Sequence, residues 1–140
     1  MATITAREII DAAALYTLNN AEWCRGAFAR DKNYMPIAHS CSTAHSFCML
    51  GAVLRTAIRD YDISERECLR LTALLNSRRH YTAFQLSRYD PQMSLAVWFN
   101  DIYAHSKRAV ISKLNRIAHS PHTTKVSFYG RRQYVYTPRR

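Results

Sequence analysis

The sequence has 140 residues, 48% of them hydrophobic, and a formal net charge of +10. A chain of this length can bury one hydrophobic core, and its three glycines and four prolines argue against disorder. It has no apolar stretch long enough to cross a membrane and no signal-like N-terminal segment, so we expect one cytoplasmic domain.

The positive charge lies mainly in the last forty residues. Residues 1–100 carry 11 Lys and Arg against 9 Asp and Glu, a net charge of +2. Residues 101–140 carry 9 against 1, a net charge of +8. This asymmetry predicts that the C-terminal part attracts anions.

The N-terminal part predicts two helices separated by a loop. The segment Thr5–Glu8 has the form of a capping box, and the apolar spacing behind it predicts a helix to about residue 20. Residues 23–41 show no sustained period and predict a long ordered loop. From Ser42 an apolar stripe predicts the central buried helix, in which Gly51 and Ala52 permit close approach of another element.

Three further helices are predicted in the rest of the chain. Ser64–Glu67 repeats the capping-box pattern and opens a third helix. Residues 81–86 predict a short irregular or helical connector, and Asp90-Pro91 predicts the N-cap and first residue of a fourth helix. The last helix begins after Ser106 and ends at Pro121.

The tail is rich in aromatic and β-branched residues. Gly130 and Arg131 can form a two-residue turn that pairs residues 126–129 with residues 132–136 as a β-hairpin. The predicted fold is therefore mostly α: a compact bundle of about five helices over residues 1–120, with a basic aromatic hairpin or tail at residues 121–140 packed on it.

Three segments together resemble one family. Glu22–Ala27 resembles a W-C-x-G-A element, and Ala44–Val53 resembles an A-x-x-x-C-x-x-G-A element. Phe99–Asp101, followed by Ser106 and Val110, resembles an aromatic-N-D, then Thr/Ser, then Val element. The family is the domain of unknown function 6197, found mainly in actinobacteria and their phages, and the resemblance covers roughly residues 8–118. It implies a helical unit and a phage or mobile-element setting, which would place the protein in the host cytoplasm, and it implies no activity.

One alternative is a metal site or a thiol enzyme built on Cys24, Cys41, His45 and Cys48. Zinc binds four Cys or His ligands tetrahedrally, and a helix would place His45 and Cys48 on one face. Their spacing matches no usual zinc motif, and Cys48 lies in an apolar stripe where a cysteine is commonly a small hydrophobic residue. Cys24 beside Arg25 suggests a nucleophile instead. We favour neither, and expect no cofactor and no enzymatic activity.

Asn100-Asp101 and the two tryptophans are predicted to have structural roles. Asn and Asp favour caps and turns, because their side chains bond to local backbone, and ligand binding is the alternative. Trp23 and Trp98 have apolar neighbours and are predicted to anchor the core or a seam between elements.

The leading hypothesis is a non-enzymatic binding protein with a basic C-terminal face. Cations neutralise phosphates and aromatic rings stack on bases, which is the mixture used to hold nucleic acid. The predicted anion-binding residues, with those of the last helix facing outward, are Lys107, Arg108, Lys113, Arg116, Lys125, Arg131, Arg132, Tyr134, Tyr136, Arg139 and Arg140. The expected partner is nucleic acid, a nucleoprotein complex or an acidic protein surface, and the setting suggests a phage accessory factor or an inhibitor of host defence. The third alternative is a protein-interaction module that pairs through the aromatic hairpin.

Overall fold

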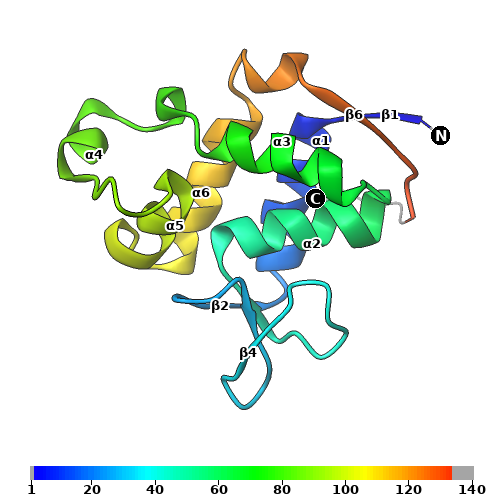
Figure 1. Cartoon of the computed structure of the whole chain (residues 1–140), viewed down its shortest axis with the longest axis horizontal. Coiled ribbons are helices and arrows are strands. Elements are labelled where there is room, and N and C mark those ends of the chain that lie inside the picture. The colour runs from blue at the N-terminus through cyan, green and yellow to red at the C-terminus, as the bar shows by residue number, and fades with distance from the viewer. Residues whose placement is uncertain (1, 134–140) are drawn as a thin grey trace.

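The computed structural model describes residues 2–133 and is mostly helical (Figure 1). The α-helices are α1 (Ala6–Ala12), α2 (Met49–Tyr61), α3 (Glu65–Leu75), α4 (Ala83–Arg88), α5 (Leu95–Trp98) and α6 (Lys107–Ala118). The π-helical segments η1 (Ala13–Leu18) and η3 (Phe99–Tyr103) continue α1 and α5. The short 3₁₀ helices are η2 (Arg78–His80) and η4 (Thr123–Lys125). The strands are β1 (Ala2–Thr5), β2 (Glu22–Trp23), β3 (Ala29–Arg30), β4 (Pro36–Ile37), β5 (Ser46–Phe47) and β6 (Ser127–Gly130).

Three of the predicted helix starts are confirmed by their N-caps. The hydroxyl of Thr5 accepts a hydrogen bond from the amide of Glu8 at 3.0 Å, and Ser64 and Ser106 cap α3 and α6 in the same way. Each cap satisfies one of the free amides at a helix start. In α1 the reciprocal half of the predicted capping box is replaced, because the carboxylate of Glu8 binds Arg132.

Two helix starts differ from the prediction. The central helix α2 begins at Met49, because the thiol of Cys48 accepts a hydrogen bond from the amide of Gly51 and caps it there. Helix α5 begins after Ser94, and the carboxylate of Asp90 instead accepts from the amide of Gln92 in a local turn. Short polar side chains stabilise such turns as readily as helix caps.

The predicted loop at residues 23–41 contains most of a small mixed sheet. Its strand order is β2-β5-β3-β4, with β2 and β5 parallel and the other pairs antiparallel. The β2 and β4 labels in Figure 1 mark this sheet where it extends from the helices. Strands of two residues have no detectable alternation, so the sequence pattern does not indicate them.

The two ends of the described chain pair with each other. Strand β6 lies antiparallel to β1, with Ile4 opposite Phe128, and the two run side by side in Figure 1. Beyond β6 the amides of Arg131 and Gln133 bond to carbonyls at the end of α2, both at 2.7 Å. A strand at this position is confirmed, but within the described residues it pairs with β1 and makes no hairpin. Residues 134–136 of the predicted second arm lie outside the described residues.

One core joins the helices. Its fully buried side chains come from α1, α2, α3, α5 and α6, and Phe128 of β6 packs into it at 2% exposure. Gly51 allows the predicted close approach, since a Cβ there would lie 2.0 Å from the carbonyl oxygen of Phe28. No helix among residues 2–133 has the length and apolar character of a membrane span.

Candidate anion-binding site

Lys113 of α6 is buried, which corrects the prediction that it faces outward. Its exposure is 4%, while Val110, Leu114 and Ile117 around it are fully buried. Residues three and four apart lie on the same side of a helix, so Lys113 shares the inward face with Val110 and Ile117. The helix therefore places a lysine ammonium inside the protein.

The ammonium of Lys113 is held by neutral groups. It donates to the backbone carbonyl of His80 at 2.7 Å and to the side-chain oxygen of Gln85 at 3.0 Å. It also lies 4.7 Å from the ring centre of Tyr81 and 5.1 Å from that of Phe99. These contacts solvate the cation partly, but none of them neutralises its charge.

Lys113 lines a pocket of about 330 Å³ whose lining contains other basic side chains and no acidic one. Arg79 and His80 of η2 and Arg116 of α6 line the pocket, which we call the Lys113 pocket. The Nε2 atom of His80 is buried and has no hydrogen-bond partner, and the His122 ring lies 6.3 Å from the His80 ring. The pocket thus presents basic side chains to whatever enters it, and a buried polar atom without a partner lies in its lining.

The electrostatics of the pocket show the same imbalance. Burial, together with the weaker repulsion from the nearby Arg116 guanidinium, lowers the pKa of Lys113 to about 8. Burial also lowers the pKa of His80 to about 4, with added repulsion from His122, Arg79 and Lys113. None of the ion pairs between described residues includes Lys113, Arg79 or Arg116. A buried charge costs free energy unless it is paired, so the Lys113 pocket is suited to bind an anion.

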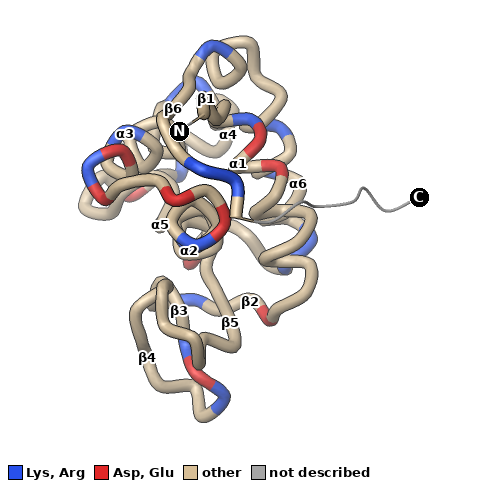
Figure 2. The backbone as a smooth tube through the Cα atoms, turned by 90° about the vertical axis from the view of Figure 1, so that its right-hand side faces the viewer, with Lys and Arg blue, Asp and Glu red and all other residues tan. Residues whose placement is uncertain are grey.

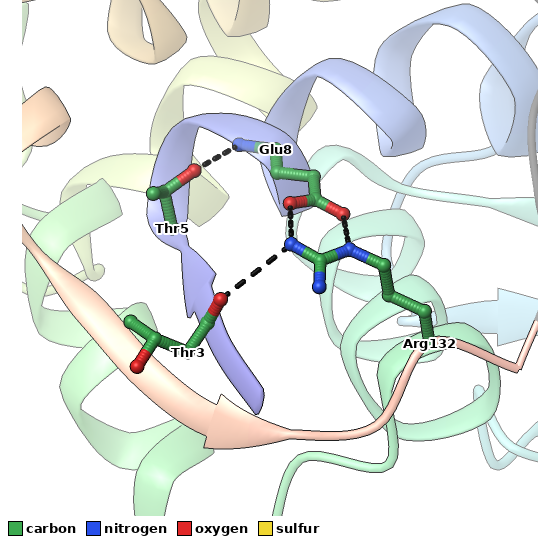
Figure 3. Close-up of polar contacts among 4 residues, drawn as sticks. All are labelled: Thr3, Thr5, Glu8 and Arg132. Carbon is green, nitrogen blue, oxygen red and sulfur yellow. Dashed lines mark hydrogen bonds and ion pairs between the residues drawn. The ribbon is translucent and has the colours of Figure 1, made fainter. Parts of the chain in front are cut away.

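Two other predicted anion-binding residues are engaged within the protein. Lys107 donates to the carbonyl of Ala21 at 2.9 Å. Arg132 forms two hydrogen bonds with the carboxylate of Glu8, at 2.6 and 2.7 Å, and reaches the carbonyl of Thr3 (Figure 3). This pair joins β6 to α1, which leaves the Arg132 charge largely neutralised.

The remaining predicted cations that the structure describes are exposed and come from α6, from η4 and from the residue after β6. They are Arg108, Arg116, Lys125 and Arg131. In Figure 2 lysine and arginine occur on the helices, beside β6 and on the small sheet, with acidic residues among them. Four predicted residues, Tyr134, Tyr136, Arg139 and Arg140, lie outside the described residues.

The predicted metal ligands Cys24, Cys41, His45 and Cys48 do not form a site. Among residues 2–133 no three His, Cys, Asp or Glu side chains are placed to hold a metal ion. Cys41 is exposed, and His45 lies 3.8 Å from Glu22. The Cys48 thiol is committed to capping α2.

The buried thiols are also poorly suited to nucleophilic chemistry. Burial raises the pKa of Cys24, and it raises the pKa of Cys48 to about 12. A nucleophilic cysteine needs a lowered pKa, because the thiolate is the reactive form. The neighbouring Arg25 instead lies over the ring of Trp23 at 4.8 Å and bonds to the carbonyl of Ala104.

The segments that resemble the family meet at one buried side chain, Asn100. Its Oδ1 accepts from the indole of Trp23 at 2.7 Å and from the amide of Met49 at 2.9 Å. Its Nδ2 donates to the carbonyl of Cys24 at 3.0 Å and to Asp101 at 2.8 Å. Asn100 is 1% exposed, so these bonds connect three distant segments away from water. We call this network the Asn100 hub.

Asp101 extends the hub to the turn after β2. Its carboxylate also accepts from the amide of Gly26 at 3.1 Å, and Gly26 has a φ of +77°, which favours glycine. These contacts agree with the predicted structural role of Asn100-Asp101, but most of them are long-range and are not the local caps or turns that were predicted. Trp23 and Trp98 anchor the packing as predicted, with Trp98 only 2% exposed.

The sequence analysis missed Arg79 and His80 as site residues. Their basic pair directly follows a helix, which is by itself a weak signal. The stronger signal was the position of Lys113, three residues after Val110 and four before Ile117. A lysine at an inward position of an amphipathic helix indicates a buried cation.

The comparisons give a family without an assigned activity. The family of unknown function DUF6197 matches residues 1–120, and no curated protein or solved structure matches the chain. The match covers the Lys113 pocket residues and the three segments that meet at the Asn100 hub. The chain therefore belongs to the DUF6197 family.

Proposed function

We propose that this chain is a non-enzymatic protein that binds nucleic acid by receiving a backbone phosphate in the Lys113 pocket. The observation that carries the proposal is the buried ammonium of Lys113, which has no carboxylate partner among the described residues. A phosphate would supply the missing negative charge.

The other lining groups suit a phosphate. Arginine donates in a planar fork that matches phosphate oxygens, and both Arg79 and Arg116 border the pocket. His80 is neutral at pH 7, and its free Nε2 can donate when the ring hydrogen is on that atom. Asp11 forms ion pairs with Arg7 and with His119 at the C-terminal end of α6, and it does not line the Lys113 pocket.

The charge of the whole chain supports a polyanion over a small anion. The net charge of +10 attracts a polyanion over long range, and exposed cations such as Arg78, Arg108 and Lys125 can contact further phosphates. Action on a host nucleoprotein complex stays a prediction from the sequence. The same holds for pairing through the aromatic tail.

The test is fluorescence anisotropy with a labelled DNA oligonucleotide at several salt concentrations. Each phosphate contact contributes a log-log salt slope of about −0.7 to −0.9, so affinity should fall steeply with salt. The double variant Arg79→Ala/Arg116→Ala should bind at least about tenfold more weakly, because it loses hydrogen bonds to a charged group.

The matched control is Arg59→Ala/Arg66→Ala, which removes two exposed arginines of α2 and α3 and gives the same net charge. It should retain most of the affinity. Equal losses in the two double variants, or an affinity that does not change with salt, would contradict the proposal. Competition by polyglutamate as strong as competition by unlabelled DNA would assign the pocket to acidic proteins instead.

A further inference from the structure

An aromatic groove lies close to the Lys113 pocket: Phe84 of α4 lines the groove, and the next residue, Gln85, accepts a hydrogen bond from Lys113. It measures about 620 Å³ and lies between α4, η3 and α6. Two of its lining side chains are large, apolar and open to solvent: Phe84 is 57% exposed and Ile102 is 59% exposed. Exposed apolar side chains that border one groove commonly mark a binding surface.

The groove and the Lys113 pocket share one set of packed aromatic rings. The Tyr81 ring lies 5.9 Å from Phe99, Phe99 lies 5.4 Å from Tyr103, and Tyr103 lies 5.5 Å from Trp98. Tyr81 lines the pocket, and Tyr103 and Trp98 line the groove. The two cavities are thus neighbours that share this row of packed rings.

Helix α6 contributes lining residues to both cavities. Ala109 lines the groove, whereas Lys113 and Arg116 line the pocket. With a rise of 1.5 Å per residue, these positions are about 6 to 10 Å apart along the helix. One or two nucleotides of an extended strand can span that distance.

The charge of the groove fits a nucleic acid strand. Its ionisable members are Arg88, His105 and Tyr103, and none of its lining residues is acidic. The guanidinium of Arg88 lies 4.8 Å from the ring centre of Phe84, so a cation and an aromatic ring stand together at the rim. Bases stack on aromatic rings and on arginine planes in the same way.

We propose that the aromatic groove receives an unpaired base of the strand whose phosphate occupies the Lys113 pocket, so that the chain prefers single-stranded to double-stranded nucleic acid. A base within a duplex has both faces covered by its neighbours, and only an unpaired base offers a free face to Phe84 and Tyr103. This inference rests on the proposed function and adds the form of nucleic acid that is bound.

The test compares one labelled 20-nucleotide strand with a duplex of the same sequence, for the intact chain and for Phe84→Ala. Loss of one stacking ring should weaken single-strand binding by about 5- to 100-fold. Duplex binding, which uses phosphates only, should change less than twofold. Phe84 is exposed, so the variant should fold, and its thermal unfolding verifies this.

The matched control is Phe28→Ala, which removes a phenylalanine that is 46% exposed and lies outside the groove. It should leave both affinities unchanged. Equal affinity of the intact chain for strand and duplex, or no effect of Phe84→Ala on strand binding, would overturn the inference and leave the proposed function standing. Absence of binding to both probes would instead overturn the proposed function.

A photo-crosslinking experiment tests the same contact without a variant. A strand that carries 5-iodouracil should crosslink to aromatic residues of the groove, and mass spectrometry would identify Phe84 or Tyr103. Crosslinks confined to the small sheet around Phe28 would contradict the inference.

Discussion

The Asn100 hub and the Lys113 pocket are both built around a buried polar side chain, but only one of them is complete. At the hub both polar atoms of the Asn100 amide have two partners within hydrogen-bond distance. In the pocket the Lys113 ammonium has neutral partners and cationic neighbours. The hub needs nothing from outside the chain, whereas the pocket lacks a negative charge.

This difference separates a structural role from a binding role. A satisfied buried network specifies how segments pack, and changing it costs stability. A buried cation without an anion costs stability as it stands, and a ligand of opposite charge would recover part of that cost. Substitutions at the hub should therefore act on folding, and substitutions at the pocket should act on binding.

The largest effect is expected for Asn100→Ala. The change leaves the indole of Trp23, the amide of Met49 and the carbonyl of Cys24 without their partner, at roughly 1–3 kcal/mol for each buried group. We expect a loss of about 4 kcal/mol in the free energy of unfolding, measured by urea denaturation. Asn115→Ala, at an exposed position of α6, should cost less than about 0.5 kcal/mol. Similar losses in the two variants would show that the hub is not structural.

A smaller loss is expected for Gly51→Ala, which tests the close approach of Gly51 in α2 to the backbone of Phe28. The added Cβ would lie 2.0 Å from the carbonyl oxygen of Phe28, and backbone must move to admit it. Overpacking of this kind costs about 1–3 kcal/mol. Urea denaturation should show that loss. Alanine is the better helix former, so helix propensity alone would predict a gain in stability, which is the opposite of the expected result. A stabilised variant would contradict the close approach.

The pocket should show its effect through ligand-dependent stability. Sulfate at about ten times its dissociation constant should stabilise the folded chain by about 1.4 kcal/mol, or roughly 3–6 °C in Tm. Sulfate also stabilises proteins in general, so the decisive quantity is the difference between the intact chain and Lys113→Met. The variant keeps the length of the side chain and removes its charge, and it should lose the specific part of the shift.

The Arg79→Ala/Arg116→Ala variant provides a second reading of the same experiment in case Lys113→Met folds poorly. It should also respond less to sulfate than the intact chain does. Equal sulfate responses in the intact chain and in both variants would contradict the proposal that the pocket binds anions.

Sequence reasoning predicted the helix caps well and the long-range contacts poorly. Thr5, Ser64 and Ser106 were readable because a cap depends on neighbours within one turn. Cys48 was missed as a cap, since a thiol is an uncommon one. Asn100 bonds to Trp23 across 77 residues, and no local pattern encodes such a contact.

Only part of the Lys113 pocket could likewise be predicted from the sequence. The burial of Lys113 follows from its spacing on α6, and the prediction that it faces outward, which follows from its charge, is wrong. The approach of Arg79 and His80 to α6 depends on how η2 and α4 pack, which the spacing does not encode. Among residues 2–133 strand β6 was located by composition, but its partner β1 is more than a hundred residues away.

The smallest expected effect is a dependence of oligonucleotide binding on pH, which should arise from the Lys113 pocket and not from the Asn100 hub. The pKa of Lys113 is about 8, so raising the pH from 7 to 9 removes most of its charge and should weaken oligonucleotide binding by up to about tenfold. Two other groups that face it keep their state over this range: His80, with a pKa of about 4, stays neutral, and Tyr81 has a raised pKa and stays neutral. The remaining charged groups that line the pocket are the guanidinium groups of Arg79 and Arg116. His122, beside His80, is the remaining ionisable neighbour. A bound phosphate favours the protonated lysine, which moves the decline to higher pH without changing its direction.

Anisotropy titrations at pH 7, 8 and 9 measure this decline, and Lys113→Met should bind weakly with a flat profile over the same range. A decline that persists in Lys113→Met would assign the titration to another group, whereas its loss would place the binding charge at the position where the fold leaves a cation without a partner.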